Sequence, residues 1–269
     1  MREHAPPSGR LFADDFAVSG PADATRLQAN APLTGVGALH GGAIAAFALL
    51  AARRGCCGDQ PAQIPSAASF HINFLRAGRG DRFNAQTTSA RQVKELNFFD
   101  LSIRDAGDHV VASAHTTLSA RCTDLRAADP WTTPRCDGAE YEAAGRALPF
   151  LRDRGLSVPG VDVGLLEMSF APVARNLDAD GAVHEAAMLT LIDAAGSTIP
   201  YTVRRPKSHG ATLSLSAHFT GHRPASTVHA RARIRDHSAQ YFWSEIDLVD
   251  SKATHCGSAT LLYRFADEN

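Results

Sequence analysis

The sequence predicts an α+β protein in which one unit, a long buried helix with an antiparallel sheet, occurs twice. Two apolar, alanine-rich segments, 41–54 and 184–199, have the length and periodicity of helices. Each is followed by four stretches in which polar and apolar residues alternate, as they do in half-buried strands. His40 precedes His184 by 144 residues, and the later strands of the two halves match at an offset of 145. Such self-similarity indicates an internal duplication.

The first half begins with residues 10–30, which predict two short strands separated by Ser-Gly-Pro. A buried helix is expected from Gly41 to Arg54, with Gly55 as its stop signal. Alternation and aromatic residues then predict four strands joined by short turns, at 69–75, 81–91, 97–104 and 110–118.

Residues 121–146 interrupt this pattern with several proline and glycine turn signals and predict a linker between two domains, 1–120 and 147–269. The second domain is expected to begin with a strand at 161–170 and to contain a helix at 184–199 that Pro200 stops. Four more strands follow, at 211–219, 227–234, 241–249 and 257–265. Two such units would bury the same surfaces against each other, as a fused dimer does.

Composition excludes several classes of protein. The 269 residues allow one large or two ordinary domains, and a formal net charge of −1 gives no argument for binding nucleic acid or an anionic membrane. Because the sequence shows neither a signal peptide nor an apolar run of roughly 18 residues, we expect a cytoplasmic protein. Five cysteines and scattered histidines lack zinc-site spacing, so reduced thiols and no metal are expected.

Asp193 is the best catalytic candidate, because it lies in the middle of an apolar helix. At 100° per residue it shares a face with Ala186 and Leu189, which directs its carboxylate towards the protein interior. Burying an unpaired carboxylate costs several kcal/mol, so it is expected to have partners or a task. The simpler alternative is an acid that caps a neighbouring backbone group. In the first half, Leu49 takes the place of this acid.

Gly41 and Gly42 begin the first-half helix, so no side chain blocks the free backbone N–H groups found at every helix start. Oriented N–H dipoles at such a position stabilise negative charge. The alternative is that the two glycines only permit close helix packing.

These residues resemble the hotdog thioesterase superfamily, specifically the double-hotdog acyl-CoA thioesterase II-like proteins, across nearly the whole chain except the linker. The stretch SFHINFLRAG at 69–78 resembles the "SFHxxFLRPG" signature, with alanine for proline. The stretch LHGG at 39–42 is similar to the helix start of the phenylacetate-pathway and 4-hydroxybenzoyl-CoA type thioesterases. Their acid falls nine residues after the histidine. Asp193 lies nine residues after His184, whereas the residue nine after His40 is Leu49, which is not an acid.

The resemblance implies a tandem hotdog that hydrolyses acyl-CoA to a free acid and coenzyme A at one composite site, without a metal or redox cofactor. Asp193 of the second half would face Gly41 and Gly42 of the first, with the Gly41 N–H as oxyanion donor. The mirror site, Leu49 with residues 185–186, would be inactive. Whether Asp193 is a nucleophile or a general base stays open.

Three further residues are candidates. Thr212 matches the threonine of the family pattern "ATxDHS", although the Asp and His of that pattern are absent. Ser197, one helical turn after Asp193, could hydrogen-bond the carboxylate or a water, or its own helix backbone. His40 could contact substrate, orient the loop before the glycines, or cap the helix.

The glutamine that the resemblance places on the last strand is missing, and Ala259 stands at its position. This absence motivates an alternative function, a catalytically silent acyl-CoA-binding or scaffolding double hotdog. A hotdog hydratase would need an Asp/His pair on a strand or loop, which the sequence does not show. A homo-oligomer of double hotdogs is compatible with either function. Several basic residues are candidates for the coenzyme A phosphates: Arg76, Arg79, Arg82, Arg204, Arg205 and Lys207.

Overall fold

The computed structural model describes residues 9–30, 33–34, 37–57, 65–120, 125–206 and 209–266. In the first half a long helix is surrounded by six strands. These elements are η1 (Ala13–Asp15), β1 (Val18–Ser19), β2 (Ala24–Gln28), α1 (Gly41–Cys57), β3 (Ser66–Phe74), β4 (Arg82–Val93), β5 (Leu96–Arg104) and β6 (Val110–Ser119).

The second half repeats this plan with two short helices added in front. Its elements are α2 (Ala139–Arg146), α3 (Pro149–Arg152), β7 (Leu156–Asp162), β8 (Leu165–Phe170), η3 (Ala174–Asn176), α4 (Glu185–Thr198), α5 (Pro200–Val203), β9 (Gly210–Phe219), β10 (Val228–His237), β11 (Tyr241–Asp250) and β12 (His255–Phe265).

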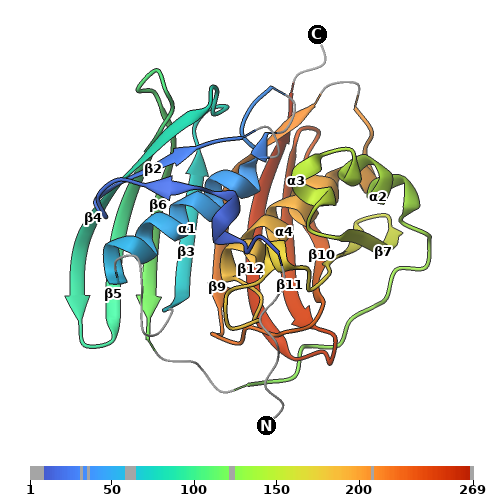
Figure 1. The fold of residues 1–269 in the computed structure, drawn as a ribbon. Coiled ribbons are helices and arrows are strands. Elements are labelled where there is room, and N and C mark those ends of the chain that lie inside the picture. Colours follow the sequence, from blue (N-terminus) through green and yellow to red (C-terminus); the bar gives the residue numbers. More distant parts are fainter. Residues whose placement is uncertain are drawn as a thin grey trace.

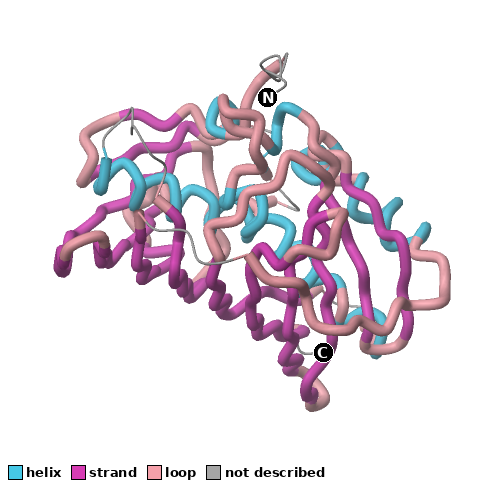
Figure 2. The backbone as a smooth tube through the Cα atoms, turned by 90° about the horizontal axis from the view of Figure 1, so that it is seen from below, coloured by secondary structure: helices cyan, strands magenta, loops and turns pink. Residues whose placement is uncertain are grey.

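The strands form one 12-stranded antiparallel sheet in the order β1-β2-β4-β5-β6-β3-β9-β12-β11-β10-β8-β7. The two halves meet where β3 pairs with β9. In Figure 1 the first half lies on the left and the second on the right, with α1 and α4 in front of the sheet near its centre. Figure 2 shows the strands as a continuous layer along one side, with these helices on the other. The predicted double-hotdog architecture is therefore the observed one.

The junction confirms the duplication. His71 of β3 is the direct partner of Ser216 in β9, and these two positions are 145 residues apart, which is the offset of the sequence repeat. In an antiparallel pair related by a twofold axis, a residue faces its own equivalent only at the axis. The pseudo-twofold axis therefore passes between these residues, and His71 Nδ1 lies 2.7 Å from Ser216 Oγ.

The two long helices are buried almost throughout, which explains their apolar composition. They cross where the first turn of α1 meets the middle of α4. A Cβ atom on Gly42 would lie 2.9 Å from Thr190 Cα, and Thr190 Oγ1 donates to the Gly42 carbonyl at 3.3 Å. This close approach brings the start of one helix beside the polar residues of the other.

Several expected boundaries were wrong. Helix α1 continues through Gly55 to Cys57. Helix α4 does end before Pro200, at Thr198, and Pro200 then begins the short helix α5, because proline is tolerated at the first position of a helix. Residues 161–170 are not one strand but parts of β7 and β8, joined by a turn at Gly164 with φ +74°. Both arms of a hairpin alternate with the same period, so the alternation did not reveal the turn.

The start of the chain and the linker also differ from expectation. The first of the two strands predicted within 10–30 is replaced in part by η1, and β1 is only two residues long. The predicted linker, 121–146, belongs largely to the surface of the second half, since α2 packs on β7 there. The backbone of Cys136 forms an isolated antiparallel β-bridge with Val161 of β7.

Candidate active site

Asp193 lies at the contact between the two halves. Its side chain comes from α4 and the residue is 2% exposed. Thr212 Oγ1 donates a hydrogen bond to Asp193 Oδ1 at 2.9 Å. On the other side, a Cβ atom built on Gly41 would lie 2.8 Å from Asp193 Oδ2, so the carboxylate occupies the space that any other side chain at position 41 would fill. The structure thus brings together three of the predicted site residues.

The two glycines at the start of α1 have different surroundings. The Gly42 N–H donates to His40 Nδ1 at 3.0 Å, so this donor is already used. Among the residues that the structure describes, the Gly41 N–H has no hydrogen-bond acceptor. Gly41 therefore offers the free N–H dipole, whereas Gly42 permits the helix crossing at Thr190.

His40 caps α1, as His184 caps α4 by accepting from the Ala186 N–H at 2.9 Å. Burial lowers the pKa of His40, a shift that the Asp193 carboxylate opposes and Arg154 reinforces. Although His40 Nδ1 lies 3.5 Å from Asp193 Oδ2, this nitrogen accepts from Gly42, so the approach is not a pair of opposite charges. The neutral ring holds the helix start in place beside the carboxylate.

A β-bulge positions Thr212. The pairing of β9 with β12 shifts between Ser214, opposite Leu262, and Thr212, opposite Tyr263, so that Leu213 is the extra residue. Such a bulge redirects a side chain locally, here towards α4. Ser197 behaves differently, because its hydroxyl donates to the Ala194 carbonyl at 3.3 Å and not to the carboxylate. Of its two expected roles, the backbone bond is the one observed.

The strand register also locates what lies opposite Thr212. Ala259 is the partner of Ala217, four residues along β12 from Tyr263 and therefore roughly 13 Å away at about 3.3 Å per residue. Tyr263 is the partner of Thr212, is 5% exposed, and its hydroxyl lies 3.2 Å from that of Tyr201. Both tyrosines were missed by the sequence reasoning. Only the spacing of eight residues from Asp193 to Tyr201 could have indicated one of them.

Known proteins resemble this chain in part of its sequence and in its fold. Residues 30–119 match the family model described as acyl-CoA thioesterase N-terminal domain. A hot dog fold protein from Alicyclobacillus acidocaldarius aligns with 96% of this chain and 98% of its own, at 17% identity and a TM-score of 0.73. Residues 30–119 therefore match an acyl-CoA thioesterase N-terminal domain, and the chain as a whole has the hotdog fold.

Two further solved structures share this fold over the whole chain. The tesB protein of Mycobacterium avium subs paratuberculosis covers 95% of this chain and 98% of its own, at 14% identity and a TM-score of 0.71. The acyl-CoA thioesterase II TesB2 of Mycobacterium marinum covers 96% and 98%, at 12% identity and a TM-score of 0.70. No curated protein sequence matches the chain. The predictions of a double hotdog and of an acyl-CoA thioesterase are confirmed.

The mirror position of this thioesterase fold is filled rather than open. Glu185, the first residue of α4, is 1% exposed and accepts from Arg53 Nη2 at 2.7 Å. It also accepts from Ser66 Oγ at 2.6 Å and from the Ala67 N–H at 2.9 Å. Leu49, at the position equivalent to the acid, is fully buried. The second position therefore holds a saturated ion pair with no free carboxylate oxygen beside a helix start.

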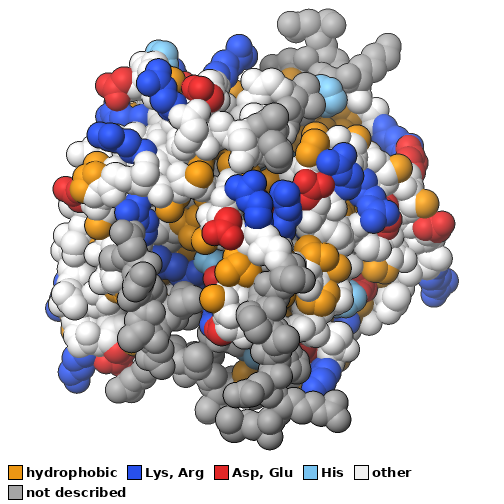
Figure 3. Space-filling view, viewed as in Figure 1, with side chains coloured by type: hydrophobic (Ala, Val, Ile, Leu, Met, Phe, Trp, Pro, Cys, Tyr) orange, Lys and Arg blue, Asp and Glu red, His pale blue; other side chains and the backbone are white. Residues whose placement is uncertain are grey.

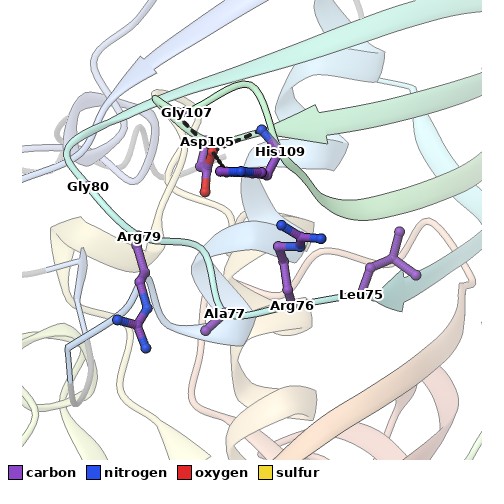
Figure 4. Close-up of a pocket in the computed structure, with 8 residues that line it drawn as sticks. All are labelled: Leu75, Arg76, Ala77, Arg79, Gly80, Asp105, Gly107 and His109. Carbon is purple, nitrogen blue, oxygen red and sulfur yellow. Dashed lines mark hydrogen bonds and ion pairs between the residues drawn. The ribbon is translucent and has the colours of Figure 1, made fainter.

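A surface groove lies near the start of α1. It has a volume of about 710 Å³ and is lined by Leu75, Arg76, Ala77, Arg79, Gly80, Asp105, Gly107 and His109. Figure 4 shows Arg76 extending towards the turn that Asp105 and His109 form, while Arg79 points away from it. The Gly78 carbonyl in this loop accepts from the Leu39 N–H at 2.9 Å, which joins the groove to the segment just before Gly41.

The other basic candidates are placed less favourably. Arg205 is bidentate to Glu140, with both distances 2.9 Å, and Arg82 is exposed beside Asp81. Lys207 lies outside the described residues. On the face drawn in Figure 3, basic and acidic side chains are interspersed, without a large field of one sign.

Within the described ranges, no group of three or more His, Cys, Asp or Glu side chains could hold a metal ion. In the same part of the chain, none of the helices has the length and apolar character that crossing a membrane requires. Cys56, Cys57, Cys136 and Cys256 are free thiols, and Cys122 lies outside the described residues.

Proposed function

We propose that the chain hydrolyses an acyl-CoA thioester to a free acid and coenzyme A at one composite site, with Asp193 as general base. The observation that carries this proposal is the contact between Asp193 of α4 and Gly41 of α1. It places a buried carboxylate beside an unused backbone N–H, and these are the two groups that hydrolysis of a thioester needs.

In this mechanism the thioester oxygen accepts from the Gly41 N–H, whose dipole stabilises the charge that develops on it. Asp193 takes a proton from a water molecule as the water oxygen bonds to the carbonyl carbon. The carbon–sulfur bond then breaks, and the thiolate of coenzyme A receives the proton from Asp193. The Thr212 hydroxyl fixes the orientation of the carboxylate by donating to Oδ1. No metal or redox cofactor takes part in these steps.

The groove beside Gly78 supports coenzyme A as the leaving group, because its two arginines offer positive charge for phosphate groups. Arg76→Ala and Arg79→Ala are expected to raise KM for an acyl-CoA severalfold but not KM for the matching acyl-pantetheine, which lacks the nucleotide. Arg91→Ala, an exposed change on β4, serves as the matched control. Equal effects on both substrates would remove the groove from the proposal.

The central test is thiol release from a panel of short, long and aromatic acyl-CoAs. Asp193→Asn should lower kcat by roughly 10²–10⁴-fold, the usual contribution of a general base. If the wild type turns over no acyl-CoA but binds one, the chain is the silent binding protein instead. A single turnover in ¹⁸O-labelled water separates the two roles of the acid, because ¹⁸O within Asp193 would show that the carboxylate itself attacks the thioester.

A further inference from the structure

Two tyrosines from the elements next to Asp193 and Thr212, Tyr263 of β12 and Tyr201 of α5, have no role in the mechanism above. Tyr263 of β12 is the cross-strand partner of Thr212, so the two side chains emerge at neighbouring points on the same face of the sheet. That face is the one towards α4, since Thr212 donates to Asp193. The Tyr263 hydroxyl lies 3.2 Å from the Tyr201 hydroxyl.

Tyr201 reaches this place from the helix side. It follows Asp193 by eight residues and Ser197 by four, and residues at these spacings share one face of a helix. The backbone keeps a helical conformation between α4 and α5, since Ile199 has φ −57° and ψ −32°. The Tyr141 hydroxyl donates to the Tyr201 carbonyl at 3.3 Å, which anchors this short helix. The hydroxyl pair therefore links α5, the short helix that follows the acid-bearing α4, to β12, the strand that pairs with Thr212.

The duplication supplies an internal comparison. In the first half, Ala67 pairs with Leu118, and these residues are the equivalents of Thr212 and Tyr263 at an offset of 145. Each pair lies next to a β-bulge, and the two bulges are at equivalent positions in the two halves. The backbone is thus equal in the two halves, but the hydroxyl groups occur only in the half that supplies the acid. Leu118 fills the equivalent place in the first half, so packing alone does not require the hydroxyl group of Tyr263.

The charge environment keeps the Tyr263 hydroxyl protonated. Burial raises its pKa, and the hydrogen bond with Tyr201 and the negative charge of Asp193 raise it further. Tyr263 is therefore a neutral hydrogen-bond donor at neutral pH. In a pair of hydroxyls one proton lies between the two oxygens and the other remains available for a third acceptor.

We propose that Tyr263 is the third polar group of the Asp193–Thr212 site, where its hydroxyl binds the water that attacks the thioester, and that Tyr201 is the positioning residue for that hydroxyl. The inference rests on the proposed function. It also explains how the site can work with alanine at position 259, because the register places Tyr263, not Ala259, opposite Thr212.

The test compares kcat, KM and thermal midpoint for Tyr263→Phe and Tyr201→Phe, with Tyr241→Phe on the neighbouring strand as control. Tyr263→Phe should lower kcat roughly 10–100-fold, as expected when a donor to the reacting atoms is lost. KM should stay within about twofold and the thermal midpoint should not change, because phenylalanine keeps the shape of the ring. Tyr201→Phe should lower kcat less, and Tyr241→Phe not at all.

A double variant provides the readout that a structural role would not give. If Thr212→Val and Tyr263→Phe disturb one shared arrangement of acid and water, their combined loss in kcat should be smaller than the product of the single losses. An unchanged kcat in Tyr263→Phe, while Asp193→Asn is inactive, would overturn this inference and leave the proposed function intact. A fall in thermal midpoint with kcat retained per folded molecule would overturn it too. If Tyr263→Phe does not fold, Tyr201→Phe decides by the same criteria.

Discussion

Glu185 stands at the first position of α4, where Gly41 stands at the first position of α1, and this difference gives the two helix starts opposite surroundings. Gly41 leaves room for the carboxylate of the opposite helix, which approaches to within 2.8 Å of where its Cβ would be. Glu185 instead places its own carboxylate in the equivalent space and binds Arg53 of the opposite helix. One position holds the carboxylate of the opposite helix beside an N–H with no acceptor among the described residues, and the other is closed by an ion pair.

The closed position is expected to contribute to stability and not to turnover. Glu185→Gln leaves the buried Arg53 charge without its partner, so the free energy of unfolding should fall by roughly 3–5 kcal/mol, measured by urea denaturation. The matched control is Glu140→Gln, which breaks an exposed pair with Arg205 and should cost about 1 kcal/mol or less. Loss of turnover in folded Glu185→Gln would show that the reaction uses this half as well.

The two glycines should separate activity from packing. In Gly41→Ala the backbone N–H remains, but the new Cβ meets the Asp193 carboxylate, which must turn away from its place beside Thr212. The value of kcat should therefore fall by roughly 100-fold, as for a displaced general base, with little change in thermal midpoint. In Gly42→Ala the new Cβ meets the Thr190 backbone, which cannot move, so unfolding should become easier by about 1–3 kcal/mol. If Gly41→Ala and Gly42→Ala lose kcat and stability in the same proportion, the two glycines do not have the separate roles assigned to them.

Thr212 is expected to act through its hydroxyl. Thr212→Val keeps the shape of the side chain but removes the donor to Asp193, and a hydrogen bond to a charged group is worth about 1.5–3 kcal/mol. This corresponds to a loss in kcat of roughly 10–150-fold. Thr212→Ser retains the hydroxyl and should stay within a few-fold of the wild type. Equal losses in the two variants would argue for a packing role.

The two capping histidines predict a dependence of stability on pH. Burial lowers the pKa of His40 and of His184 below 6.5 in the folded state. The unfolded chain therefore binds more protons in this range, and stability is lost as pH falls below about 6.5, by up to about 1.4 kcal/mol per pH unit for each histidine. His184→Asn keeps a helix cap but does not titrate, so its stability should fall less steeply between pH 6.5 and 5. Identical slopes for wild type and variant would contradict this.

The elements that the sequence predicted are those whose cause is local. Helix α1 and the strands of both meanders follow from periodicity along the chain, and the offset of 145 residues was borne out at the His71–Ser216 pair. The boundaries that went wrong lie at Gly55 and Gly164, where local preference permits more than one continuation.

The site was predictable only in part. The spacing of acids and glycines, together with a family resemblance, was enough to pair Asp193 with Gly41, although about 150 residues separate them. The family resemblance places the missing glutamine at Ala259, and what stands opposite Thr212 in the sheet depends on strand register, which the sequence does not record. The bulge at Leu213 decides that Thr212 faces the acid and that Tyr263 stands opposite it.

The sequence by itself therefore determined two helix-and-sheet units and the acid Asp193 in the middle of the second apolar helix, since both follow from the order of apolar and polar residues. Only the tertiary structure decided which donors meet that acid. The crossing of α1 and α4 leaves the Gly41 N–H free while His40 occupies that of Gly42, and it lets Glu185 close the other position. These outcomes depend on hydrogen-bond distances between residues far apart in the chain, which no local pattern encodes.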